Sequence, residues 1–69
     1  MNKLRFFRKQ LGMTQIELAE LAKCTPGAIC HYERGRRGMD INLCRRFVEI
    51  FNECGIHVGL DDIFPPKAA

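Results

Sequence analysis

The segment from Thr14 to Gly35 limits the possible folds more than any other, because two short helical patterns meet in it with almost nothing between them. The first pattern consists of three apolar residues at helical spacing, Leu18, Leu21 and Ala22. The second follows a Thr-Pro start signal and consists of Ala28, Ile29, Tyr32 and Glu33. Only Lys23 and Cys24 separate the end of the first pattern from that signal. We therefore expect two short helices joined by a tight turn rather than by a flexible loop.

The length of the chain limits it to one domain with one modest core. A chain of 69 residues buries only about 60% of its unfolded surface. Hydrophobic residues make up 46% and charged residues 28%, which is typical of a globular domain and not of a disordered segment. We expect an all-α domain over residues 1–64, with the two-helix unit at 14–35 and a short tail at 65–69.

The net charge of +3 is unevenly distributed along the chain. The segment 1–37 holds eight Lys and Arg against three Glu, whereas 38–69 holds three against five acidic residues. The two-helix unit lies in the basic half. This asymmetry favours a polyanion as partner for one face, although a modest positive charge also serves solubility.

No apolar run approaches the roughly 18 residues that span a bilayer, and the opening MNKLRFFRKQ lacks the apolar core of a signal peptide. We expect a cytoplasmic protein that has no membrane partner. Its four cysteines are then expected to be reduced thiols rather than two disulfides.

Asn2 is expected to cap a first helix that runs to about Gln10. Its buried stripe consists of Leu4, Phe7 and Leu11. Phe6 lies off this stripe, and we favour a half-buried position under the C-terminal tail over a place on a contact surface. Gly12 ends the helix.

Local signals define the next two helices. Thr14, with Glu17 three residues later, predicts a capping box at the start of a helix that continues to Ala22. Lys23 is then expected to reverse the chain in a left-handed conformation. Thr25 and Pro26 are favoured at the cap and first position of a third helix.

Asp40 is expected to cap a fourth helix from Ile41 to about Glu53. Its apolar arc covers about half of the circumference, more than one core face requires. We therefore expect part of it, with the segment from Val58 to Phe64, to form a dimer interface. The candidates are Leu43, Ile50, Val58, Leu60 and Ile63. A short final helical turn before Pro65 is expected to cover the core.

Arg8, the run LGMTQIELAELA and the run TPGAICHYERGRR together resemble the helix-turn-helix domain of lambdoid phage repressors, Cro proteins and the wider xenobiotic-response-element family of bacterial regulators. The resemblance extends from Leu4 to Phe64. It implies a five-helix, lambda-repressor-like fold that places the helix from Pro26 to Arg34 in the DNA major groove. It also implies a transcription regulator, expected to be a repressor that binds double-stranded DNA as a homodimer on a two-fold operator. We expect no cofactor and no small-molecule ligand.

The resemblance also assigns roles to individual residues. Gln15 matches a family glutamine that holds a DNA phosphate at the start of the second helix. We expect the other phosphate contacts to come from Thr14, Lys23, Arg34, Arg36 and Arg37. Arg8 and Glu33 match a structural ion pair between the first and third helices. The positions that face bases or the groove are Thr25, Pro26, Gly27, Ala28 and His31.

The reading positions depart from the family pattern. Neither Pro26 nor Gly27 has a donor or acceptor side chain, so bidentate readout of a base is unavailable there. His31 is either a reader or a surface histidine. Gly27 either permits close approach of a ligand or is simply tolerated in the helix. Specificity is expected to be weak or to depend on DNA shape.

The sequence also bears on four functions other than DNA binding. The same fold serves protein-binding modules such as antitoxins or adaptors, for which Phe6, Ile16, Leu43 and Ile50 would be the contact surface. Cysteine and histidine ligation of zinc or redox sensing is disfavoured because no Cys-x-x-Cys pair occurs. We do not expect an enzyme, since the acidic residues mostly cap or flank helices. Binding to a membrane surface is disfavoured because the basic residues are spread over several helices.

Overall fold

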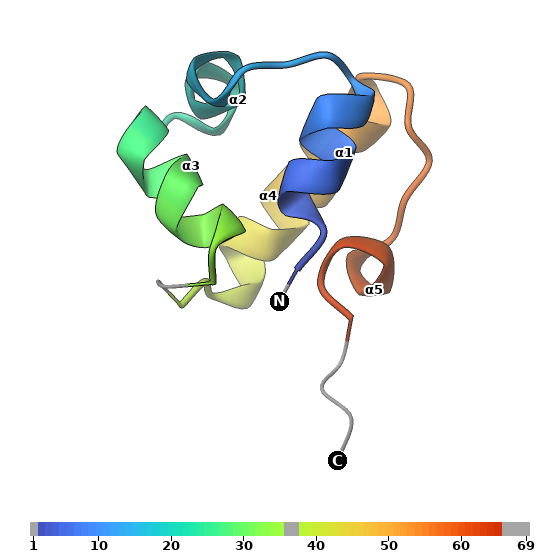
Figure 1. The fold of residues 1–69 in the computed structure, drawn as a ribbon. Helices are drawn as coiled ribbons and strands as arrows, with labels where there is room; N and C mark the ends of the chain where they lie inside the picture. Colours follow the sequence, from blue (N-terminus) through green and yellow to red (C-terminus); the bar gives the residue numbers. More distant parts are fainter. Residues whose placement is uncertain (1, 36–37, 66–69) are drawn as a thin grey trace.

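The computed structural model describes residues 2–35 and 38–65 of the chain. Within these ranges it forms five helices and no strand, which confirms the all-α fold with five helices. The helices are α1 (Leu4–Gln10), α2 (Gln15–Ala22), α3 (Pro26–Glu33), α4 (Ile41–Glu53) and α5 (Leu60–Ile63). In Figure 1, α2 and α3 form one end of the molecule, α1 lies in front of α4, and α5 lies near the start of α1.

The predicted helix starts are present. The Thr14 hydroxyl accepts a hydrogen bond from the Glu17 amide at 3.1 Å, and the Glu17 carboxylate accepts one from the Thr14 amide at 3.0 Å. The Thr25 hydroxyl accepts from the Ala28 amide at 3.1 Å, and the Asp40 carboxylate caps α4 in the same way. Each such cap contributes about 1 kcal/mol to helix stability. Local sequence alone therefore sets where α2, α3 and α4 begin.

Asn2 links the start of α1 to the end of α3. Its side-chain oxygen accepts from the Leu4 amide at 3.0 Å, although the backbone places the cap position one residue later, at Lys3. Its side-chain nitrogen donates to the carbonyl of Tyr32 at 2.8 Å. Asn2 thus both supports the first turn of α1 and attaches it to the last turn of α3.

The turn between α2 and α3 has the conformation expected from its length. Lys23 has φ 57° and ψ 47°, which is left-handed, and costs about 1–2 kcal/mol for a residue other than glycine. The Cys24 amide donates to the carbonyl of Ala19 at 2.9 Å and closes the turn. This backbone hydrogen bond ends α2 and, with the left-handed Lys23, sets the direction in which the chain leaves it toward α3.

Every helix contributes side chains to one core. Its largest fully buried side chains are Leu4, Leu18, Ile29, Phe47, Phe51 and Ile63. Phe7 lies 6.1 Å from Phe51 and Tyr32 lies 6.2 Å from Phe47 between ring centroids. The Lys3 amide donates to the carbonyl of Ile63 at 2.8 Å, so α5 is held against the start of α1. The inner faces of α2 and α3 therefore pack on this core, while the first residues of both helices remain at the surface.

Most of the wide apolar arc of α4 is covered by other helices of the same chain. α4 packs against both α2 and α5, so two neighbours cover the arc instead of one. Ile50 is only 8% exposed and Ile63 is fully buried. These two residues were wrong as interface candidates, since their side chains are already in the core. Leu43, Val58 and Leu60 are half-buried and keep some exposed surface.

Two apolar residues of the helical patterns lie outside the core. Phe6 is 55% exposed. Its ring lies edge-on to the ring of Phe7, with 5.1 Å between the two ring centroids. Its expected half-buried position was wrong, because α1 turns it away from the buried stripe. Of the expected cover, the tail at 65–69, only Pro65 is among the described residues. Leu21 is 47% exposed although its spacing matches that of its buried neighbours Leu18 and Ala22.

Candidate nucleic-acid interface

A buried polar network connects α1, α2 and α3. The Arg8 guanidinium donates through Nε to Glu33 Oε2 at 2.5 Å and through Nη2 to Glu33 Oε1 at 3.3 Å. Its Nη1 donates to the carbonyl of Met13 at 2.7 Å, just before α2. Gln15, the first residue of α2, donates through Nε2 to Glu33 Oε1 at 3.0 Å. The expected pairing of Arg8 with Glu33 is thus present and is extended to a third helix by Gln15.

The two charged groups of this network, the guanidinium and the carboxylate, are both shielded from solvent. Arg8 and Glu33 are both buried, and no buried side-chain nitrogen or oxygen in the described part of the chain lacks a hydrogen-bond partner. Removing one member of such a pair leaves an uncompensated charge and costs about 3–5 kcal/mol. The network therefore makes the relative orientation of α1, α2 and α3 specific.

The network also orients Gln15. A carboxylate only accepts hydrogen bonds, so the amide nitrogen of Gln15 must face Glu33. That nitrogen carries a second hydrogen, and the residue stands at the start of α2, where backbone amides favour anions. Gln15 is half-buried. The residue expected to contact phosphate is thus held in place by the buried ion pair.

The start of α3 presents most of the expected reading positions at the surface. Thr25, Pro26 and Gly27 are exposed and His31 is half-buried. Ala28 is buried, so we correct its assignment as a groove contact, because its methyl group packs inside the domain. The exposed surface at the expected reading positions therefore consists mainly of backbone, a proline ring and one threonine.

Of the residues expected to contact phosphate, Thr14, Lys23 and Arg34 are exposed. Arg36 and Arg37 lie outside the described residues. Lys23 follows α2 and Arg34 follows α3, so each stands at the end of one helix of the two-helix unit.

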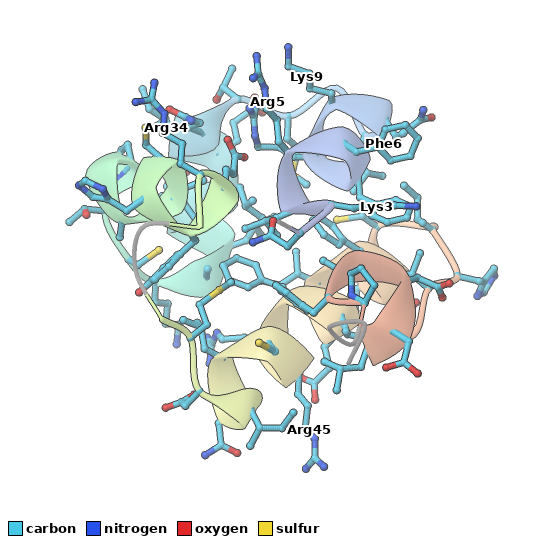
Figure 2. The ribbon with its side chains drawn as sticks, turned by 60° about the horizontal axis from the view of Figure 1, so that its bottom comes forward. Lys3, Arg5, Phe6, Lys9, Arg34 and Arg45 are labelled. Atoms are coloured by element: carbon cyan, nitrogen blue, oxygen red, sulfur yellow. The ribbon has the colours of Figure 1, made fainter. Side chains whose placement is uncertain are left out.

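Two further cations were missed by the sequence analysis. Arg5 and Lys9 are exposed on α1, and Figure 2 shows them projecting to the same side of the molecule as Arg34, with Arg45 on the opposite side. With Gln15 they line a hollow of about 550 Å³ between α1 and α3. Their spacing of four residues predicts a shared helix face, but only the packing of α1 beside α3 brings that face next to Arg34.

The four cysteines are free thiols. Burial raises the pKa of Cys24 and of Cys44, and nearby Asp40 adds to the rise at Cys44. A raised pKa keeps a thiol protonated and unreactive at neutral pH. Among the described residues, no three His, Cys, Asp or Glu side chains gather as metal ligands would. In the same ranges, every helix is too short or too polar to cross a membrane.

Comparison with known proteins agrees with this geometry. A helix-turn-helix family model matches residues 4–57, which includes α1 to α4 and the turn between α2 and α3. The chain belongs to this helix-turn-helix family, the lambda-repressor-like or xenobiotic-response-element type. Neither the comparison with curated proteins nor that with solved structures gave a significant match. Membership of the family indicates a DNA-binding transcription regulator.

Proposed function

We propose that this protein regulates transcription by placing α3 in the major groove of duplex DNA, with the start of α2 on the adjoining phosphate backbone. The observation that carries the proposal is the network of Arg8, Glu33 and Gln15. It fixes the start of α2 relative to α3, and an α-helix is the element that the major groove admits.

The basic residues around this surface support the same orientation. Arg5, Lys9 and Arg34 project to one side and would meet phosphates that flank the groove. Such contacts supply affinity and register without selecting a sequence. We therefore assign Arg5 and Lys9, together with Arg34, to the backbone contacts of the complex.

We further propose that the protein acts as a repressor and as a homodimer on a two-fold site. A single unit contacts too few base pairs for strong discrimination, so two copies on half-sites one helical turn apart are the expected solution. Leu43, Val58 and Leu60 remain candidates for the dimer contact because their side chains are only half-buried. Sedimentation over a concentration series, free and on DNA, tests this point, and a monomer under both conditions would exclude it.

The direct test of function is a fluorescence anisotropy titration of random and selected duplexes at several salt concentrations. We expect binding that weakens as salt rises, and that Gln15→Ala weakens it further. Gln10→Ala is the matched control, because Gln10 is an exposed glutamine outside the network. Absence of salt-dependent binding to every duplex would contradict the proposal.

A second candidate function, a protein-binding module, is favoured by one observation. Phe6 is 55% exposed on α1, and a large exposed aromatic ring is common at protein interfaces. Under this alternative, duplex DNA does not bind, and Phe6→Ser abolishes capture of a protein partner without changing the free energy of unfolding.

A further inference from the structure

An exposed apolar surface adjoins the start of α3. It is formed by Met13, Ile16 and Pro26, which line one shallow hollow, and we call it the apolar edge. Ile16 is 59% exposed, Pro26 is exposed and Met13 is half-buried. Ile16 is the second residue of α2 and Pro26 is the first of α3, so the apolar edge bridges the two helix starts.

The surroundings of the apolar edge restrict what can cover it. The same hollow is lined by Lys9 and by Gln15, and of the described residues no Asp or Glu lines it. Its partner should therefore combine negative charge with small apolar groups. The major-groove edge of duplex DNA has this combination, because thymine presents a 5-methyl group there between rows of phosphates.

The glycine at position 27 also favours duplex DNA as the partner of this surface. A methyl group built on it would meet nothing nearer than the hydroxyl oxygen of Thr25, at 4.0 Å. No side-chain packing within the described residues therefore requires glycine, although glycine lowers helix stability. A bare backbone at this position leaves the ring of Pro26 free to approach the floor of the groove.

We infer that the apolar edge reads thymine 5-methyl groups, so that the protein selects thymine at the positions facing the start of α3. This inference rests on the proposed function and names the chemistry of its specificity. Apolar contact takes the place of the hydrogen bonds that Pro26 and Gly27 cannot make. Ile16 and Pro26 are the residues that determine this selectivity.

The test removes only the methyl groups. A selected duplex is compared with duplexes in which single thymines are replaced by deoxyuridine, which keeps every hydrogen-bonding group of the base pair. We expect wild type to lose about 3- to 5-fold in affinity at one or two positions of each half-site, as burial of one methyl group predicts. Ile16→Thr, which keeps the branch at Cβ but replaces the ethyl arm of isoleucine with a hydroxyl group, should bind both duplexes nearly equally.

Leu21→Ala is the matched control, since Leu21 is also an exposed apolar residue of α2 but does not line the hollow. It should retain the preference for thymine. Equal binding of thymine and deoxyuridine duplexes by wild type would overturn the inference while leaving DNA binding intact. A preference that persists in both Ile16→Thr and Pro26→Ala would overturn the assignment to the apolar edge. Failure to bind any duplex would instead overturn the proposed function, and the inference with it.

Discussion

The buried network and the start of α3 differ in almost every physical respect, although Gln15 and Pro26 line the same hollow. Arg8 and Glu33 are buried, charged and paired at defined distances. Pro26 and Gly27 are exposed and carry no polar side-chain atom. The first region fixes how the helices are oriented, and we propose that the second determines which bases they contact.

Because of this difference, the orientation of the helices and the choice of DNA sequence depend on different residues. A buried ion pair tolerates little change, because the loss of either partner leaves a charge without compensation. An exposed helix start tolerates many side chains, because surface substitutions usually change stability by less than about 0.5 kcal/mol. A protein of this kind can therefore keep one way of docking on DNA while the sequence it selects is set by a few exposed residues.

The largest effect is expected from breaking the network. Arg8→Ala leaves the carboxylate of Glu33 buried without its partner, and we expect the free energy of unfolding to fall by about 3–5 kcal/mol. Urea denaturation measures this loss. Arg5→Ala, an exposed arginine of the same helix, should change stability by less than about 0.5 kcal/mol. Similar losses in the two variants would show that the network does not hold the helices in place.

Removing the basic residues should weaken binding without changing base preference. The slope of log affinity against log salt is negative, and we expect Arg5→Gln, Lys9→Gln and Arg34→Gln each to make it less steep by about 0.9 per lost phosphate contact. Arg45→Gln is the control, because Arg45 projects to the opposite side of the molecule. A slope that responds equally to Arg45 would contradict the orientation proposed for the complex.

Gly27→Ala should raise stability and lower affinity at once. The new methyl group meets no close neighbour, so alanine should stabilise the free protein by about 0.5–1 kcal/mol through its better helix propensity. The same methyl group would stand between the backbone of α3 and the floor of the major groove. The affinity for DNA should therefore fall. Thermal unfolding and anisotropy measure the two effects. Gly12→Ala, at a φ of 69°, should instead destabilise the protein.

The smallest effect concerns the turn between α2 and α3. Lys23→Gly should raise the free energy of unfolding by about 0.5 kcal/mol, because glycine adopts the left-handed conformation without the steric cost that lysine incurs. Urea denaturation at two salt concentrations separates this gain from any effect of the lost charge. A net loss of stability would mean that the strain at Lys23 is smaller than the entropy cost of glycine.

Much of the fold could be predicted because its signals are local. The capping box of Thr14 with Glu17 and the Thr25-Pro26 start each act within one helical turn, and the structure confirms both. The pairing of Arg8 with Glu33 joins residues 25 positions apart and was available only through the family resemblance.

What the sequence could not predict depends on how the helices pack. Ile50 is buried because α4 has neighbours on two sides, which its own periodicity does not reveal. The bond from Gln15 to Glu33 requires the start of α2 to lie beside the end of α3. In the same way, Arg5 and Lys9 join Arg34 only because α1 packs against α3.

We propose that duplex DNA meets the starts of α2 and α3 and the basic side of α1. Amide chemical-shift mapping of the labelled protein, titrated with a selected duplex, tests it most directly. We predict the largest shifts at Gln15, Ile16, Gly27 and Arg34, with little change along the buried side of α4. Shifts concentrated instead on α4 and α5, or absent throughout, would contradict this orientation of the protein on DNA.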